Sequence, residues 1–577
     1  MAAAARAAGY PATPAPDAPV LAGTPVKVKP VVFWGICDVK YDPRVPLRQR
    51  VKVLELGDGR SSRFSHHGKH IKEKFDAEYC MDPSPLKRAV MVDNKKFTHD
   101  MFVRAGFAHL RPMQYCYPRR YETDLAARIA RDLEVSEDGA VVLKLVNRSR
   151  GAGVVVCPVA ELDVTLRRLL TPPIGPELDS WLRDHATKAA LHDDPDAELL
   201  EEQTRHYWAN ECPLFVVEEL CHSEPVDWPD SPGGDEKFDG TMRVAFALLR
   251  AKDGKTLSID WLGGYWKLPP VAARDEDSGR LEDVHCRIVS SFNTEEKRTA
   301  EVPAEHLKEV FDALSPALPE IFAAGTFGSA IIKSSYPDDP HFRAFALSRA
   351  AAAMRSTDDI SKVAFLMEQA KKLVTPKGTN NAEDLPERSV LSYIDRSMGV
   401  NAALQGKWSK AVKHFDDAIK QLPTNSSAHY LKGMSLQEEG KYAEAVPCHL
   451  SSVALDPDFR SPCIALGSCW CCMGQYQDAV DASLACLHRQ PDAPVAQFNM
   501  GQAIYQMLHK GFKGTDAEAA KLRKNALEAL QIAKSGTPQQ WGEAEEAMLR
   551  YFLVGASSRN MLSRVPVKVW KNYGWRP

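Results

Sequence analysis

The sequence has no apolar run long enough to cross a membrane and no excess of positive charge. None of its apolar stretches approaches the roughly 18 consecutive residues that predict a membrane-spanning helix. The formal net charge is -3, whereas a general binder of nucleic acid or of an anionic membrane surface favours a strong basic excess. We therefore expect neither a nucleic-acid partner nor a membrane partner.

Cysteine is present but forms no recognisable framework. The 13 cysteines are scattered through 577 residues, and a chain of this size can bury several cores without disulfides. We therefore predict a reducing compartment, the cytoplasm. The first 28 residues are rich in Ala and Pro. Because the prolines interrupt any apolar core that a signal peptide would need, we expect residues 1–28 to form a flexible tail.

A 34-residue repeat dominates the C-terminal third. The prolines at 423, 457 and 491 follow one another at this step, since 457 minus 423 and 491 minus 457 are both 34. Gly406, Gly440 and Gly474 keep the same step, as does a second glycine series at 399, 433, 467 and 501. Each unit predicts a helix, a tight turn, a second helix and then proline.

This pattern resembles the tetratricopeptide repeat (TPR), from about Pro386 to Leu508. The resemblance implies an all-α solenoid that binds a protein partner through the TPR groove. Asn directly after the first-helix glycine, which clamps a partner's C-terminal carboxylate in co-chaperones, is replaced here by Val400, Met434 and Ser468. First-helix positions are instead expected to meet a bound segment, namely Tyr393, Arg396, Tyr430, Lys432 and Gln497.

Upstream, short apolar segments alternate with helical patterns, which is typical of an α/β region with a mixed or parallel sheet. The acidic stretch from Glu177 to Glu202 interrupts this alternation and predicts a solvated helical excursion. The predicted strands span 31–36, 52–57, 141–146, 153–157, 214–220, 242–249 and 256–268.

The segment VVLKLVNRSRGAGVVVC, residues 141–157, places a lysine inside an apolar strand. With a period of two, Val142, Lys144 and Val146 share one face, so Lys144 needs an anionic partner. A strand lysine followed by a glycine-bearing loop is suited to hold a triphosphate. The phosphate-loop pattern G-x-x-x-x-G-K-[ST] never appears. A lysine that merely extends from a strand edge to solvent is the alternative.

From about Val51 to Val302 the order of such segments resembles the ATP-grasp superfamily, in which two α+β lobes hold ATP between them. The resemblance implies a multidomain protein, with an ATP-grasp-like α+β region before the TPR solenoid. It also implies ATP as cofactor and a ligase that joins a carboxylate to an amine or thiol, with a small-molecule or peptide substrate.

The residues that match the superfamily's sites fall into two groups. The implied catalytic pair is Arg243 with Lys267. The implied ATP contacts are the phosphate lysines Lys95 and Lys144, the loop residues Ser149, Gly151 and Gly153, Glu218 and Glu219 at the adenine edge, Glu224 at the ribose, and Asn293.

The superfamily's magnesium motif, an acidic strand residue followed by Glu-x-Asn, is missing. Glu320 has no partner Asn, and Asp260 comes early in the chain. Because Mg²⁺ requires oxygen ligands, the metal site stays unassigned. A second function therefore stays open, a nucleotide-binding scaffold without turnover.

A third hypothesis is a Rossmann-like methyltransferase with a TPR adaptor, because VLELGDGRSSRF places G-x-G after a predicted strand. The favoured ATP-grasp interpretation gives seven segments. They are a tail (1–28), an N-terminal α/β lobe (29–135), nucleotide-binding lobes (136–338), a helical linker (339–385), the repeats (386–508), capping helices (509–560) and a basic aromatic tail (561–577).

Overall fold

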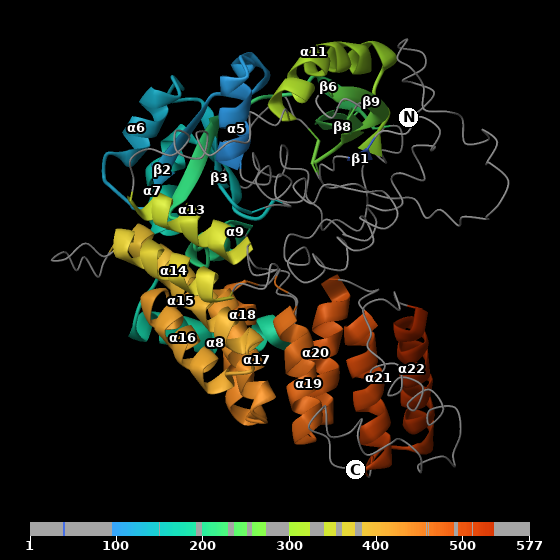
Figure 1. The fold of residues 1–577 in the computed structure, drawn as a ribbon. Coiled ribbons are helices and arrows are strands. Elements are labelled where there is room, and N and C mark those ends of the chain that lie inside the picture. The colour runs from blue at the N-terminus through green and yellow to red at the C-terminus, as the bar shows by residue number, and fades with distance from the viewer. Residues whose placement is uncertain are drawn as a thin grey trace. The chain divides into compact units, whose positions relative to one another are not determined.

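A computed structural model describes the ordered elements of both halves of the chain (Figure 1). The chain divides into two compact units, one formed by Met1–Leu170 with Cys212–Val390 and one by Thr171–Glu211 with Leu391–Pro577. The described residues are 39–40, 95–148, 151–191, 199–228, 236–250, 257–269, 271–272, 299–322, 340–353, 360–374, 384–456, 459, 461–489, 494–510 and 512–535.

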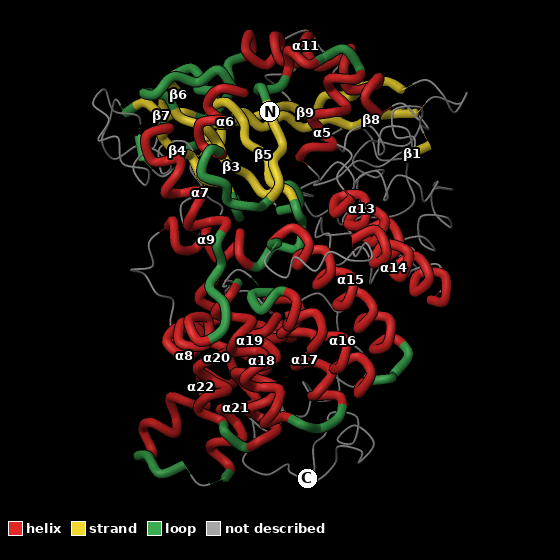
Figure 2. The backbone as a smooth tube through the Cα atoms, turned by 90° about the vertical axis from the view of Figure 1, so that its left-hand side faces the viewer, coloured by secondary structure: helices red, strands yellow, loops and turns green. Residues whose placement is uncertain are grey.

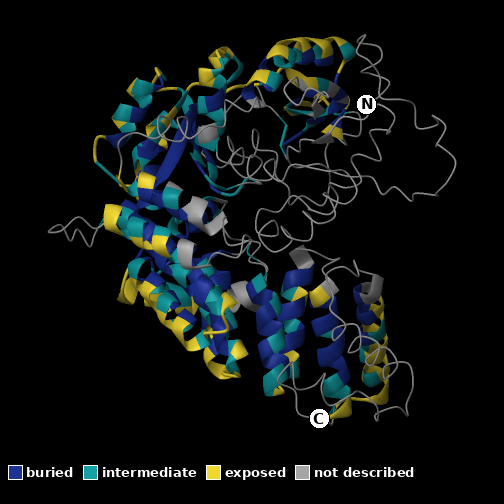
Figure 3. Cartoon of the chain, in the orientation of Figure 1, coloured by how far each residue is buried: buried dark blue, intermediate teal, exposed yellow. Residues whose placement is uncertain are grey.

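The first unit contains a four-stranded antiparallel sheet in the order β2-β5-β3-β4. Its strands are β2 (Gln114–Pro118), β3 (Ala140–Leu145), β4 (Val154–Pro158) and β5 (Leu214–Glu219). Strands β3, β4 and β5 are mostly buried (Figure 3), whereas in β2 Tyr117 is the buried residue. The apolar runs predicted β3, β4 and β5 because Val and Leu suit a pleated, buried surface, and the structure confirms these three strands. Strand β2, with the sequence QYCYP, was not predicted.

Helices and short turns accompany this sheet. The amphipathic helices α6 (Leu125–Asp132) and α7 (Leu162–Leu170) bury their leucine and isoleucine side chains, α7 next to β4. Helix α5 (Lys95–Arg104) is tied to the end of β3 by a hydrogen bond from the Lys95 amide to the Val146 carbonyl, 3.0 Å. Two 3₁₀ turns, η2 (Ala108–Leu110) and η3 (Val159–Glu161), link these elements.

A second sheet in the same unit has the order β1-β8-β9-β10. Its long antiparallel hairpin consists of β8 (Thr241–Arg250) and β9 (Leu257–Lys267); β1 (Val39–Lys40) runs parallel to β8, and β10 (Thr299–Ala300) pairs with β9. Helix α11 (Ala304–Phe322) covers one face, where the Trp261 and Phe311 rings stack 4.1 Å apart. A separate ribbon joins β6 (Pro225–Asp227) to β7 (Lys237–Asp239). The helices α13 (Pro340–Ala353) and α14 (Ile360–Val374) pack together.

The second unit is a series of antiparallel helix pairs, which Figure 2 shows as red tubes. Successive helices from α16 onward pack against one another. The turn glycines Gly406, Gly440 and Gly474 have φ of 68°, 76° and 79°, which L-residues with a side chain rarely adopt. The helices are α15 (Leu385–Leu404, which begins in the first unit), α16 (Trp408–Gln421), α17 (Ser426–Glu438), α18 (Tyr442–Leu455), α19 (Ser461–Met473), α20 (Tyr476–Arg489), α21 (Pro494–His509) and α22 (Asp516–Ser535).

The repeat is also visible in side-chain hydrogen bonds. Ser392 donates to the Ala418 carbonyl at 2.8 Å, and Ser426, 34 residues later, donates to the Ser452 carbonyl at 3.1 Å. Equivalent positions thus make equivalent contacts, as expected for stacked repeats. The predicted helix-turn-helix units are confirmed, and α22 completes a fourth pair with α21.

The acidic insert is helical, as predicted, and one of its faces is solvated. Residues 177–202 lie largely in α8 (Pro176–Leu191) and α9 (Leu199–Trp208). The charged residues Glu177, Asp179 and Arg183 are exposed, whereas Leu178 is buried. Helix α8 packs against α18 and α20, and α9 packs against α18 (Figure 2). Composition indicates the exposed, charged face but not which tertiary neighbour covers the other face. Arg205, for example, pairs with Glu201 and lies over the Trp181 ring.

Several predictions fall outside the described residues. These are the strands at 31–36 and 52–57, the G-x-G loop of the methyltransferase hypothesis, Ser149, Asn293, and the chain after Ser535. Among the described helices, none combines the length and apolar character needed to cross a bilayer.

Candidate functional sites

Lys144 has an anionic partner, as its place in an apolar strand predicts. Its ammonium forms an ion pair with the Glu218 carboxylate on the adjacent strand β5. The antiparallel register sets Val142 opposite Glu218 and Lys144 opposite Val216, so both charged side chains lie on the same face of the sheet. Glu218 is 3% exposed and Lys144 is 25% exposed. The carboxylate is therefore enclosed, while the ammonium keeps some access to solvent.

Two further residues complete the surroundings of Glu218. Gln114 on β2 donates from Nε2 to Glu218 Oε1 at 2.6 Å, and Arg111 Nη2 lies 3.8 Å from the same oxygen. Burial alone would raise the pKa of Glu218, but Lys144, Gln114 and Arg111 outweigh it and lower the pKa. Glu218 is thus held as a carboxylate. Sequence reasoning missed Gln114 and Arg111, because only strand pairing brings β2 to β5.

The other predicted phosphate lysine contacts the backbone. Lys95 Nζ donates to the Leu145 carbonyl at 2.9 Å and also to the Arg148 carbonyl. It thereby binds the chain where β3 enters the glycine-bearing loop. In that loop Gly151 and Gly153 have φ of 82° and 69°. A Cβ on Gly153 would lie 2.4 Å from Leu145 Cδ1, so both conformation and space require glycine there.

The predicted catalytic pair lies in the second sheet. Arg243 pairs with Tyr265 and Thr241 with Lys267 in the β8–β9 register, so Arg243 and Lys267 lie on one face. Of the alternating residues, Trp266 belongs to the core cluster, and the partly buried Met242 and Val244 pack against it. Burial, with a further contribution from the Arg243 charge, lowers the pKa of Lys267 to about 8. An anion on this face would be attracted by both cations and would favour the charged form of Lys267.

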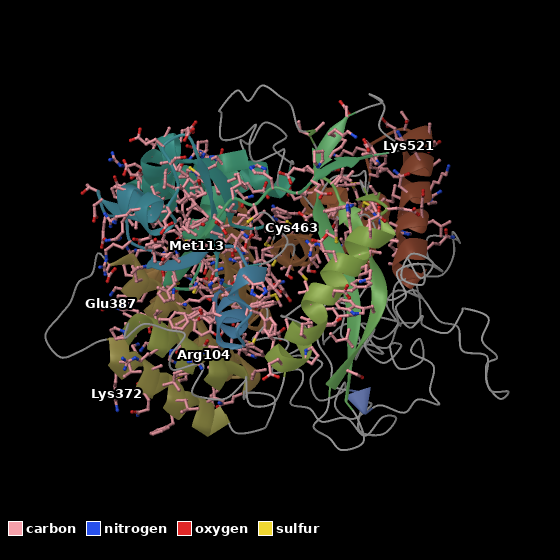
Figure 4. The ribbon with its side chains drawn as sticks, turned by 90° about the horizontal axis from the view of Figure 1, so that it is seen from above. Arg104, Met113, Lys372, Glu387, Cys463 and Lys521 are labelled. Carbon is pink, nitrogen blue, oxygen red and sulfur yellow. The ribbon has the colours of Figure 1, made fainter. Side chains whose placement is uncertain are left out.

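The remaining predicted acidic contacts have other neighbours. Glu219 accepts a hydrogen bond at 2.8 Å from the amide of Met113 (labelled in Figure 4) and donates its own amide to the Met113 carbonyl at 3.1 Å. Glu224 is exposed and lies 3.3 Å from His306 Nε2. Glu218, Glu219 and Lys144 therefore lie close together on paired strands, whereas Glu224 lies beyond the end of β5.

One group in the described part of the chain has the geometry to hold a metal ion. It consists of His341, Asp384 and Glu387, whose ligand atoms lie within 4.8 Å of one another. Figure 4 labels Glu387. Arg120 already binds both carboxylate oxygens of Asp384. Asp384 and Glu387 also lie at the start of α15, where the helix dipole favours anions without any metal. The group includes neither Glu320 nor Asp260, the acidic residues considered for magnesium in the sequence.

The first-helix positions of the repeats are largely covered by their own chain. Arg396 binds Glu211, Lys432 binds Asp416 at 2.7 Å, and Tyr430 packs edge-on against Phe459 with ring centroids 4.9 Å apart. Tyr393 and Gln497 are buried. Glu211 was not predicted from sequence, because it lies far from the repeats along the chain.

Comparison with known proteins supports the repeat assignment. No family model matches the chain. Photosystem I assembly protein Ycf3 of Cuscuta obtusiflora is 29% identical over 163 residues, which are 27% of this chain and 89% of that protein. The Ycf3 protein of Cuscuta gronovii gives the same identity and coverage. The C-terminal region is a TPR-like repeat module. A sheet-containing region precedes it.

Two solved structures resemble the chain at low overall similarity. YrrB, described as a TPR protein with an unusual peptide-binding site, is 16% identical and covers 40% of this chain and 95% of its own, with a TM-score of 0.27. MamA from Desulfovibrio magneticus RS-1 is also 16% identical, covering 34% of this chain and 97% of its own, with a TM-score of 0.27.

Proposed function

We propose that this protein binds ATP on its sheet-containing region and protein segments on its TPR-like module. In the fullest form of this proposal it is an ATP-dependent ligase of the ATP-grasp type. The observation that carries it is the Lys144–Glu218 pair, next to a loop whose Gly151 and Gly153 have backbone conformations that favour glycine. A loop of this kind can present amide groups to phosphate oxygens.

Lys144 has the electrostatic properties of a phosphate contact. It is a compact cation on a rigid strand, it is 25% exposed, and its partner carboxylate is fixed by Gln114 from the far side. A triphosphate could therefore approach the ammonium from solvent while Glu218 keeps it oriented. Charge-assisted contacts of this type contribute roughly 1.5–3 kcal/mol.

Arg243 and Lys267 supply a second pair of cations with a different property. The pKa of Lys267 is lowered to about 8, and a bound anion would raise this pKa and favour the charged form of the side chain. In the proposed reaction ATP phosphorylates a substrate carboxylate, giving an acyl phosphate and ADP. An amine or thiol then attacks the acyl carbon and inorganic phosphate leaves. Arg243 and Lys267 would stabilise negative charge on the transferred phosphoryl group.

The proposed ATP chemistry includes no step through a metal ion. The Glu-x-Asn motif that supplies the superfamily's magnesium ligands is missing from the sequence. In the group formed by His341, Asp384 and Glu387, the Asp384 carboxylate already accepts a hydrogen bond from Arg120. A nucleotide-binding scaffold without turnover is therefore the second candidate. It retains the lysine contacts but releases no ADP.

Titration of the full-length protein with ATP tests the proposal. Lys144→Ala should weaken ATP binding by about 10- to 150-fold, which corresponds to the loss of 1.5–3 kcal/mol, and Lys144→Arg should restore it only in part because the guanidinium is a planar fork. Lys237→Ala is the matched control, since this exposed strand lysine also pairs with an aspartate. No ATP affinity in the parent, or an unchanged affinity in folded Lys144→Ala, refutes the ATP proposal.

A separate measurement distinguishes ligase from scaffold. ADP release that depends on an added carboxylate substrate supports the ligase, and Arg243→Met should then lower turnover more than ATP affinity. ATP binding without any ADP release across a panel of carboxylates and amines supports the scaffold instead.

A further inference from the structure

The first repeat holds a carboxylate that belongs to the same chain. Arg396 donates from Nε and Nη2 to the two oxygens of Glu211, at 2.5 and 2.7 Å. Asn425 adds a hydrogen bond from Nδ2 to Glu211 Oε1 at 2.7 Å. This two-pronged arginine contact, with an amide donor beside it, is a strong and directional way to recognise a carboxylate.

The donors are held in place by the repeat itself. Asn425 accepts from the Ala428 amide at 3.0 Å as the N-cap of α17 and donates to Ser392 Oγ at 2.8 Å, which fixes the orientation of its side chain. The Arg396 guanidinium lies 5.0 Å from the centre of the Tyr393 ring. A preorganised site loses little conformational entropy when a carboxylate enters.

The bound segment is also recognised through its backbone. Thr424 Oγ1 donates to the carbonyl of Trp208, three residues before Glu211, at 2.6 Å. Residues 209–211 belong to neither a helix nor a strand. Ala209 and Asn210 are buried, so packing holds this point of the segment together with the hydrogen bonds to Trp208 and Glu211, which another segment of similar sequence could also form.

The site is specific to the first repeat. Arg396 lies three residues before Gly399, and the residues three before the equivalent glycines are Tyr430, Ile464 and Phe498. None of these three carries a charge. The exposed fractions of the Arg396 and Glu211 side chains are 17% and 12%, so the contact reaches the surface of its unit.

We propose that Arg396 and Asn425 form a binding site for an acidic protein segment, and that residues 208–211 occupy it in cis. A partner segment that presents a glutamate side chain binds after the chain's own segment leaves. Because the incoming carboxylate re-forms the same hydrogen bonds, the exchange is governed by competition. A tethered segment competes at an effective concentration in the millimolar range, which keeps the site closed to weak ligands. This site is independent of the proposed nucleotide site.

A peptide with the sequence of residues 204–211, TRHYWANE, tests the proposal. Its ends are acetylated and amidated so that the glutamate supplies its carboxylate, and its binding to the full-length protein is followed by fluorescence anisotropy. Glu211→Ala should bind the peptide at least tenfold more tightly than the parent does. The same peptide with glutamine in place of glutamate should lose this binding, as should Arg396→Met combined with Glu211→Ala.

Glu177→Ala is the matched control, because Glu177 is an exposed glutamate of the same insert, and it should bind the peptide as weakly as the parent does. Thr424→Val is a milder way to loosen the segment and should give intermediate binding if Glu211→Ala does not fold. Absence of binding in whichever of the two variants is folded would mean that Glu211 is a permanent structural contact. Equal binding by the parent and the opened variant would refute occupation in cis.

Discussion

Replacing Lys144 with methionine would leave the Glu218 carboxylate buried beside an apolar side chain. Glu218 is 3% exposed, and removing one partner of a buried ion pair costs about 3–5 kcal/mol because the other charge is left uncompensated. Here Lys144 is partly exposed and Glu218 keeps its hydrogen bond from Gln114. We therefore expect a loss of about 2 kcal/mol, or a factor of about 30 in the ratio of folded to unfolded protein.

A second substitution, at Glu218, tests whether the loss of stability comes from the uncompensated carboxylate. Adding Glu218→Gln to Lys144→Met removes the uncompensated charge, so the double variant should lie within about 1 kcal/mol of the parent. The assay is hydrogen exchange of the β3 and β5 amides, because a protein with two compact units has no single global unfolding free energy.

The pH dependence gives an independent check. In the parent, the pKa of Glu218 is lowered, so its contribution to stability is present above the ordinary carboxyl pKa of 4.5 and is lost as pH falls through the folded-state value. In Lys144→Met, burial favours protonation of Glu218 instead. The difference between parent and variant should therefore shrink toward pH 4. A loss below about 0.5 kcal/mol at pH 7, or a double variant no better than Lys144→Met, refutes this reasoning.

Three other predictions concern different parts of the chain. Because the folded-state pKa of Lys267 is lowered from 10.5 to about 8, the unfolded chain binds more protons between these values, and stability should rise with pH across this range; denaturation of Lys267→Met should lack this rise. Gly433→Ala should destabilise the repeats by roughly 1–3 kcal/mol in urea unfolding, since the new Cβ would lie 2.5 Å from the His449 ring, whereas Ser451→Ala on an exposed hydroxyl should have little effect. Replacing 173–209 by a flexible linker should lower the melting temperature of the helical circular dichroism signal, because α8 covers α18 and α20; an unchanged melting temperature would mean that the insert adds no stability.

The repeat module could be predicted from sequence because its signals are local and recur. The 34-residue spacing of Gly399 and Gly433 predicted where pairs of helices cross closely. In the structure Phe415 lies against Gly399, and His449 lies against Gly433. Each helix pair makes most of its contacts with its neighbours, so a pattern of 34 residues contains most of the information that the fold requires. The strand that carries Lys144 was predictable for a similar reason, since alternation within six residues fixes its faces.

The partners of the charged side chains were decided by the tertiary structure. That Lys144 needs an anion follows from its strand, but Glu218 was identified as that anion only by the β3–β5 register. Arg396 forms an ion pair with Glu211 because residues 171–211, which are inserted between two strands of the first unit, fold with the second unit. Composition indicated the exposed, charged face of that insert but not the helices on which it packs. The physical reason is the same in each case: local sequence determines which groups must be buried or paired, whereas pairing over 74 or 185 residues depends on how the whole chain folds.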